Sequence, residues 1–154
     1  ISASLALLSL GACKDKKTTT TTNTVTTTEE AAADQDDKTM MLVIDKTYSP
    51  AEASSLKIKS VTVEGDLLSV VVSYSGGCKD HEFRLISNQR YMKSLPPQLN
   101  LYLEHNGNGD MCRELIEQTL TFNVAAAQYG SNDSVTLIVN GDRESSVLYT
   151  YDRD

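Results

Sequence analysis

Alternating hydrophobic and polar residues predict short β-strands along most of the chain beyond residue 38. The alternation is clearest between residues 56 and 74, where two such segments flank the turn Glu64-Gly65-Asp66. We expect these two segments to pair as an antiparallel hairpin, with a β-bulge in the first because the apolar phase slips at Ser60. Five later segments repeat the pattern, and their inward positions are His81, Phe83 and Leu85; Leu99, Leu101, Leu103 and His105; Leu120, Phe122 and Val124; Val135, Leu137 and Val139; Val147, Tyr149 and Tyr151.

Seven short strands at this spacing predict an all-β domain over residues 38–154. The expected architecture is an antiparallel two-sheet sandwich of immunoglobulin-like type or a small barrel. We expect a polar loop closed by Leu95-Pro96-Pro97 before the strand at Leu99. Two helical turns are also expected, one at Ser49-Pro50-Ala51-Glu52, which has the form of a capping box, and one over Cys112 to Gln118.

The first thirteen residues form a different kind of segment. Residues 1–12 are apolar or small and lead through Leu10-Gly11-Ala12 to Cys13, a run too short to cross a bilayer but suited to a signal peptide. The segment resembles the lipobox of bacterial lipoproteins, in which leucine stands three places before a cysteine and small residues lie between them. This resemblance implies cleavage before Cys13 and attachment of palmitate-type acyl chains to Cys13. Several chains, at about 0.8 kcal/mol per buried methylene, hold a protein stably on a membrane.

Residues 13–37 predict a disordered tether, since they are dominated by threonine from Thr18 to Thr28 and then by acidic and small residues. The charged pair Lys14-Asp15 directly after Cys13 is similar to the export signals of surface lipoproteins of the Bacteroidetes. That similarity implies the cell surface, and the alternative is the periplasmic face of a membrane. The expected location is therefore the cell envelope.

The formal net charge of −7 argues against nucleic acid and against direct adhesion to anionic headgroups, because both are bound mainly through basic patches. A membrane is therefore expected to be reached only through the lipid anchor. An envelope protein and a glycan remain open as partners. The sequence leaves the oligomeric state open.

The candidate chemistry is concentrated in Gly76–His81 and His105–Cys112, which together hold both histidines and every cysteine except Cys13. The period of two places the two imidazoles on the same side as the apolar residues of their strands. If these strands run antiparallel, both histidines and both cysteines meet at one end of the domain.

Three interpretations of this cluster stay open. In the first, Cys78 and Cys112 form a disulfide, worth about 4 kcal/mol on the chain-entropy estimate. In the second, Cys78, His81, His105 and Cys112 bind zinc or copper. A hybrid keeps the disulfide and leaves the metal to His81 and His105, with Asp80 or Asp110 as a further ligand. In the third, calcium binds to residues at EF-hand-like positions, namely Asn106, Asn108, Asp110 and Glu117, although Met111 occupies the place that requires glycine.

No catalytic motif is recognisable in the sequence. A nucleophile pair of Cys78 and His105 fits the residue types, but a disulfide at Cys78 would abolish it. The sequence therefore predicts a lipid-anchored extracytoplasmic binding or structural module that is not an enzyme. No cofactor is expected unless the cluster holds zinc or copper.

Overall fold

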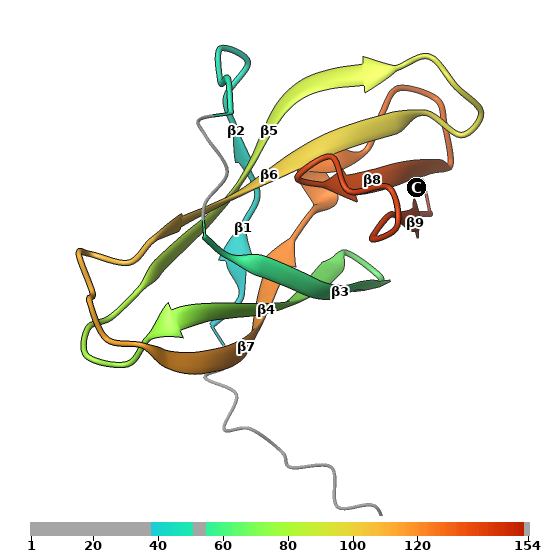
Figure 1. Ribbon diagram of the computed structural model, residues 1–154. Coiled ribbons are helices and arrows are strands. Elements are labelled where there is room, and N and C mark those ends of the chain that lie inside the picture. The colour runs from blue at the N-terminus through green and yellow to red at the C-terminus, as the bar shows by residue number, and fades with distance from the viewer. Residues whose placement is uncertain (1–37, 51–54, 153–154) are drawn as a thin grey trace, which may run out of the picture. The chain divides into compact units, whose positions relative to one another are not determined.

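The computed structural model describes residues 38–50 and 55–152 of the chain, which form two β-sheets (Figure 1). One sheet has the strand order β1-β7-β4-β3 and the other β2-β5-β6-β8-β9. The strands are β1 (Met40–Met41), β2 (Val43–Ile44), β3 (Lys57–Glu64), β4 (Leu67–Gly76), β5 (Glu82–Met92), β6 (Gln98–Asn106), β7 (Glu114–Asn123), β8 (Ser134–Val139) and β9 (Val147–Thr150). The predicted all-β sandwich is confirmed.

The hairpin of β3 and β4 is antiparallel as the sequence predicts, and its register slips between Ile58 and Ser60 at the expected bulge. Strand β4 pairs on its other side with β7 over ten residues, from Leu67 opposite Asn123 to Gly76 opposite Glu114. This long antiparallel pairing forms the centre of the first sheet.

In the second sheet, β5 and β6 are antiparallel and bring Glu82 opposite Asn106. Strand β8 runs parallel to β6 and pairs only with its first part, ending at Leu101 opposite Val139. The remaining part of β6, after Leu101, has no β8 residue paired with it and borders the candidate site described below. The parallel pairs β1–β7, β2–β5 and β6–β8 differ from the expected purely antiparallel arrangement, because β1, β2 and β8 join their partners across the sandwich and not through hairpins.

The chain passes from one sheet to the other between β1 and β2, at Leu42. The backbone N–H of Leu42 donates to the carbonyl of Asn123 in the first sheet, and Val43 already pairs with Ile86 in the second. The Leu42 side chain is buried in the core between the sheets. These short strands escape sequence analysis because two residues are too few to show an alternation.

The core lies between the two sheets and is built from the alternate positions that the sequence indicates. Its largest fully buried side chains include Tyr149, Phe122, Leu68, Leu85, Leu99, Leu101, Leu137, Val70, Val72 and Val135. Burying a side chain of this size contributes about 1.5–3 kcal/mol relative to leaving it exposed. The period of two therefore determines both the strands and the faces that they pack together.

The helix expected over Cys112 to Gln118 is wrong, because β7 begins at Glu114. Pairing with ten residues of β4 supplies backbone hydrogen bonds and a packed face that a short local helix cannot match. The expected loop before Leu95 is also shorter, since β5 continues to Met92 through an irregularity between Ser87 and Tyr91. One 3₁₀ turn, Ala125–Ala127, was not expected.

Several expectations fall outside the described residues. These are the signal peptide at 1–12, Cys13 with the tether at 13–37, and positions Ala51 and Glu52 of the expected capping box. Within the described ranges, no helix has the length and apolar character needed to cross a bilayer.

Candidate functional site

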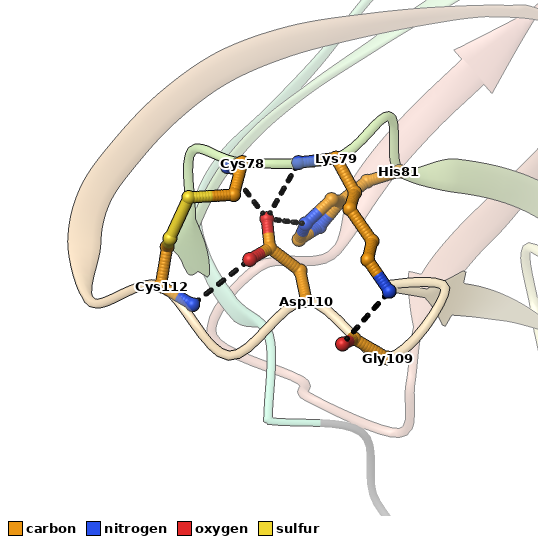
Figure 2. Close-up of a disulfide and its surroundings, with 6 residues drawn as sticks. All are labelled: Cys78, Lys79, His81, Gly109, Asp110 and Cys112. Atoms are coloured by element: carbon orange, nitrogen blue, oxygen red, sulfur yellow. Dashed lines mark hydrogen bonds and ion pairs between the residues drawn. A yellow bond between two sulfur atoms is a disulfide. The ribbon is translucent and has the colours of Figure 1, made fainter.

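A disulfide joins the two loops that the sequence analysis singles out. Cys78 follows β4 and Cys112 precedes β7, and their Cα atoms lie 5.9 Å apart (Figure 2). The bridge thus ties together the ends of two strands that already pair with one another. The disulfide interpretation is confirmed, and it removes both thiols that a zinc site or a cysteine nucleophile would need.

Asp110 organises these loops through backbone hydrogen bonds (Figure 2). One carboxylate oxygen, Oδ2, accepts from the backbone N–H of Cys78 at 2.9 Å and of Lys79 at 3.0 Å. The other oxygen, Oδ1, accepts from the N–H of Cys112 at 2.8 Å. The side chain is only 1% exposed. The N–H groups of Cys112 and Cys78 hold the pKa of Asp110 well below its usual range, with His81 and Lys79 contributing less. Asp110 is therefore an ionised carboxylate that fastens both sides of the disulfide.

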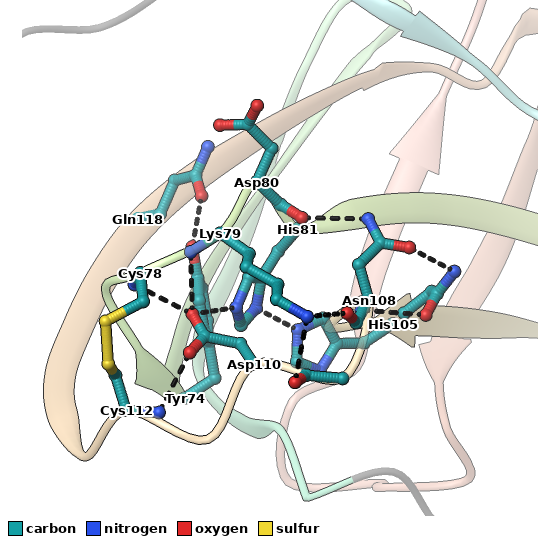
Figure 3. A network of polar contacts seen from close by, with 12 residues as sticks. Tyr74, Cys78, Lys79, Asp80, His81, His105, Asn108, Asp110, Cys112 and Gln118 are labelled. Atoms are coloured by element: carbon teal, nitrogen blue, oxygen red, sulfur yellow. Dashed lines mark hydrogen bonds and ion pairs between the residues drawn. A yellow bond between two sulfur atoms is a disulfide. The ribbon is translucent and has the colours of Figure 1, made fainter.

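The two histidines meet beside this carboxylate (Figure 3). Nδ1 of His81 lies 2.7 Å from Nε2 of His105, and Nε2 of His81 lies 3.2 Å from Oδ2 of Asp110. The His81 side chain is 3% exposed. With both rings neutral, one arrangement satisfies every contact: His81 donates from Nε2 to Asp110, and His105 donates from Nε2 to Nδ1 of His81. The predicted meeting of the histidines at one end of the domain is confirmed.

Aromatic rings enclose the pair of imidazoles. Phe83 stacks on His105 with the ring planes 10° apart, and Tyr74 packs against both histidines at centroid distances of 4.7 and 4.9 Å. The Tyr74 hydroxyl donates to Oε1 of Gln118 on β7, and burial raises the pKa of this tyrosine. The histidines thus form part of a layered aromatic end to the core.

Two glycines before Cys78 make room for this arrangement. A methyl group on Gly76 would lie 2.6 Å from both Cε1 and Nε2 of His81, so only glycine allows the ring to pack against the backbone. Gly77 has a φ of +113°, which other residues rarely adopt. The sequence Gly-Gly-Cys therefore has glycine at Gly76 because His81 approaches closely, and at Gly77 because the chain turns sharply into the disulfide.

Hydrogen bonds from Lys79 and Asn108 connect the second loop to the first. Asn108 and Gly109 have positive φ angles, as expected for a turn, and Nζ of Lys79 donates to both of their carbonyls at 2.9 and 3.2 Å. Asn108 also donates to the carbonyl of Asp80. Glu117, the last position of the EF-hand-like pattern, instead pairs with Lys59 at 2.6 Å.

The hybrid metal interpretation stays a prediction, and the geometry gives it little support. Among the described residues, the only close group of three acidic, histidine or cysteine ligand atoms comes from Cys78, Asp110 and Cys112, and two of these are bridged sulfurs. The facing nitrogens of His81 and His105 already bond to one another. The Asp80 carboxylate points away from the imidazoles in Figure 3.

The burial of His105 makes stability depend on pH. Burial, and to a smaller degree the neighbouring His81, lowers the pKa of His105 below its ordinary value of 6.5. The unfolded chain therefore binds a proton at His105 below about pH 6.5 while the folded chain resists it, so the unfolding free energy should decrease as the pH falls from 7 to 5. A second decrease is expected below about pH 4, where the unfolded Asp110 is protonated and the folded one is not.

Urea unfolding at a series of pH values measures both decreases. His105→Gln should flatten the first and leave the second in place. An unfolding free energy that stays constant between pH 7 and 5 in the unaltered protein would contradict the assignment of a neutral, buried His105.

A groove of about 950 Å³ lies beside the cluster and shares His105 with it. Its walls come from the residues around Tyr48, the start of β3, the start of β5, the last part of β6 from Tyr102 to Asn106, and the turn after β8. Tyr48 and Tyr102 pack ring against ring at 5.4 Å, and burial together with nearby Glu104 raises the pKa of Tyr48. This groove could not be predicted from the sequence, because its residues come from segments far apart in the chain and nothing in their local pattern links them.

No protein-family model matches the sequence, and neither does any curated protein. The fold is similar to that of solved proteins from Bacteroides species. One is a NigD-like immunity protein from Bacteroides caccae, with a TM-score of 0.52 and 13% identity over 71% of this chain and 58% of that one. Another is a protein of unknown function, DUF1344, from Bacteroides vulgatus, with a TM-score of 0.47 and 15% identity over 76% and 56%. This chain thus spans less than two thirds of the length of either protein.

Proposed function

We propose that this chain is a non-catalytic binding module of the bacterial cell envelope, and that its groove binds an extended segment of a partner protein. The observation that carries the proposal is the open edge of β6. Strand β8 covers β6 only as far as Leu101, so the rest of β6 has no strand beside it on that side in the described part of the chain. The groove runs along this uncovered part.

The backbone direction of β6 supports a strand as the occupant. The carbonyl of Leu101 accepts from the N–H of Asn140, and the N–H of Leu103 donates to the Asn140 side chain. Odd-numbered residues of β6 therefore direct their backbone groups toward the β8 side. By the same alternation, the carbonyl of Leu103 and the N–H of His105 point into the groove. An extended peptide can pair with these groups by strand addition.

The groove walls provide contacts for the side chains of such a peptide. Tyr48 and Tyr102 supply an aromatic surface, and Arg84 and Glu104 form an ion pair at 3.4 Å. Ile58 of β3 and Leu56, just before that strand, add apolar contacts. This combination of aromatic, apolar and paired charged groups suits a protein partner better than a free ion or a small polar ligand.

The lipid anchor is part of the proposal. Acylated Cys13 would hold the chain at a membrane, and a flexible tether over residues 13–37 would give the domain a reach of about 25–30 Å from the bilayer surface. One solved protein of similar fold is described as an immunity protein, and that description agrees with a role in binding.

Photo-crosslinking in the bacterial host tests binding and anchoring together. A photoreactive phenylalanine analogue in place of Tyr102 should yield one discrete protein adduct in the membrane fraction. The same analogue in place of Leu148, which is 55% exposed on β9, should yield none. Cys13→Ala should move the protein out of the membrane fraction while the purified variant still binds the partner's peptide.

Backbone methylation of that peptide tests the pairing itself. N-methylation at alternate residues should weaken binding in one phase and spare it in the other, because a paired strand uses every second N–H on each edge. Identical adducts from positions 102 and 148, or equal loss in both phases, would overturn the proposal. A mature protein that begins at a residue other than Cys13 would overturn the anchor.

A further inference from the structure

A pair of stacked tyrosines forms a ridge at the opposite end of β5 and β6 from the disulfide. The rings of Tyr91 and Tyr129 lie 4.0 Å apart with their planes 18° from parallel. Both residues line two shallow hollows, of about 500 and 490 Å³, so the ridge separates the hollows. Tyr129 is exposed, which leaves the outer face of its ring open to solvent.

The first ring is positioned by a strained irregularity in β5. Gln89 has a φ of +54°, a conformation that is uncommon for a residue other than glycine. The Ser87 hydroxyl accepts from the N–H of Gln89, and the Asn88 side chain accepts from the N–H of Arg90. Strand pairing resumes at Tyr91, opposite Leu99. Strain of this kind tends to collect at binding sites.

Hydrogen bonds to the rest of the protein also hold both tyrosines in place. The Tyr91 hydroxyl donates to the carbonyl of Ala127 at 3.1 Å, and the N–H of Tyr129 donates to the hydroxyl of Tyr151 at 2.9 Å. Asn132 donates from its amide to the carbonyl of Tyr129. The ridge is therefore held by the protein's own hydrogen bonds, which is the preorganisation expected of a binding surface.

The hollows are basic in an otherwise acidic chain. Lys46, Arg90 and Lys93 line them, and no carboxylate does so within the described ranges. None of the three cations takes part in an ion pair with another described residue. The nearby Asp45 carboxylate accepts hydrogen bonds from Thr47. In a chain with a net charge of −7, three such cations around one ridge indicate an anionic ligand.

We infer that this surface binds a chain of acidic sugars, such as a uronic acid polymer. The exposed face of Tyr129 suits the apolar face of a sugar ring, and the cations on either side suit its carboxylates. The amide nitrogens of Gln128 and Asn132 donate to the Tyr149 hydroxyl and the Tyr129 carbonyl, which leaves their amide oxygens to accept hydrogen bonds from sugar hydroxyls. A linear polymer can cross the ridge and occupy both hollows, a geometry that a compact anion does not need. This site is independent of the groove along β6.

Calorimetry with an oligogalacturonate tests the inference, and a neutral maltooligosaccharide of equal length is the matched ligand. The acidic chain should bind and the neutral one should not. Tyr129→Ala should weaken binding about tenfold or more, whereas Tyr129→Phe keeps the ring and should stay within about twofold of the unaltered protein. Arg90→Gln and Lys93→Gln should each weaken binding and reduce its dependence on salt. Lys59→Gln, on the other sheet, should change neither property.

Melting temperatures of all variants confirm that each is folded before its affinity is compared. Equal affinity for the neutral oligosaccharide, or an unchanged affinity of Tyr129→Ala, would overturn the inference. Tighter binding of polyglutamate than of oligogalacturonate would also overturn it and would assign the surface to acidic peptides. The absence of measurable binding of the acidic sugar would overturn the inference as well. Each of these outcomes leaves the groove proposal standing.

Discussion

Replacing Cys78 and Cys112 together by serine is expected to lower the unfolding free energy by about 2–5 kcal/mol. The bridge closes a loop between residues 34 positions apart and so restricts the unfolded chain. It also holds the backbone N–H groups of both cysteines on the two oxygens of Asp110. Loss of the bridge therefore loosens the loops as well as enlarging the unfolded ensemble. Urea unfolding of the oxidised protein and of the double variant, both carrying Cys13→Ala, measures the difference.

The same proteins decide what remains of the metal hypothesis. The oxidised protein should show no free thiol when denatured without reductant, and a chelator should leave its melting temperature unchanged. A rise in melting temperature on adding zinc or copper that disappears in His81→Ala or His105→Ala would instead establish the hybrid site. Two free thiols together with one bound metal per chain would contradict the disulfide outright.

Much of the fold could be predicted from the sequence because burial on one face imposes a period of two. The hairpin at Gly65 and the bulge near Ser60 follow from that period and from turn chemistry alone. So does the meeting of His81 with His105, which needs only the side-chain alternation and an antiparallel pair. These are features in which local pattern and tertiary packing agree.

The features that could not be predicted depend on contacts between distant segments. The sequence of residues 112–118 is compatible with a short helix. Pairing with the ten residues of β4 makes the segment from Glu114 onward part of β7 instead. Asp110 resembles a calcium or metal ligand in the sequence, yet its oxygens accept backbone N–H groups from a loop some thirty residues earlier. The residues next to Asp110 in the sequence do not indicate that its carboxylate accepts these backbone N–H groups. The ridge of Tyr91 and Tyr129 depends in the same way on an irregularity in β5.

Substituting Gly76 by alanine is expected to destabilise the protein by about 1–3 kcal/mol, the usual cost of overpacking a well-filled site. The added methyl group would lie 2.6 Å from two atoms of the His81 ring, so the ring must move. Movement of His81 breaks its contacts with His105 and Asp110 together, because the two ring nitrogens serve one contact each. Urea unfolding and the imidazole NMR signals of both histidines should report the change.

Gly107→Ala is the matched control, since its methyl group would lie 3.4 Å from Cε1 of the same His81 ring and requires only a slight adjustment. We expect its unfolding free energy to stay much closer to that of the unaltered protein. Adding His81→Ala to Gly76→Ala removes the 2.6 Å clash and leaves a milder approach of 3.2 Å to Oδ2 of Asp110, so the two substitutions together should cost less than the sum of their separate effects. Strict additivity would show that Gly76 is required for some reason other than the approach of His81. An equal loss in Gly107→Ala would mean that the loop tolerates no side chain at either glycine, whether or not the imidazole is near.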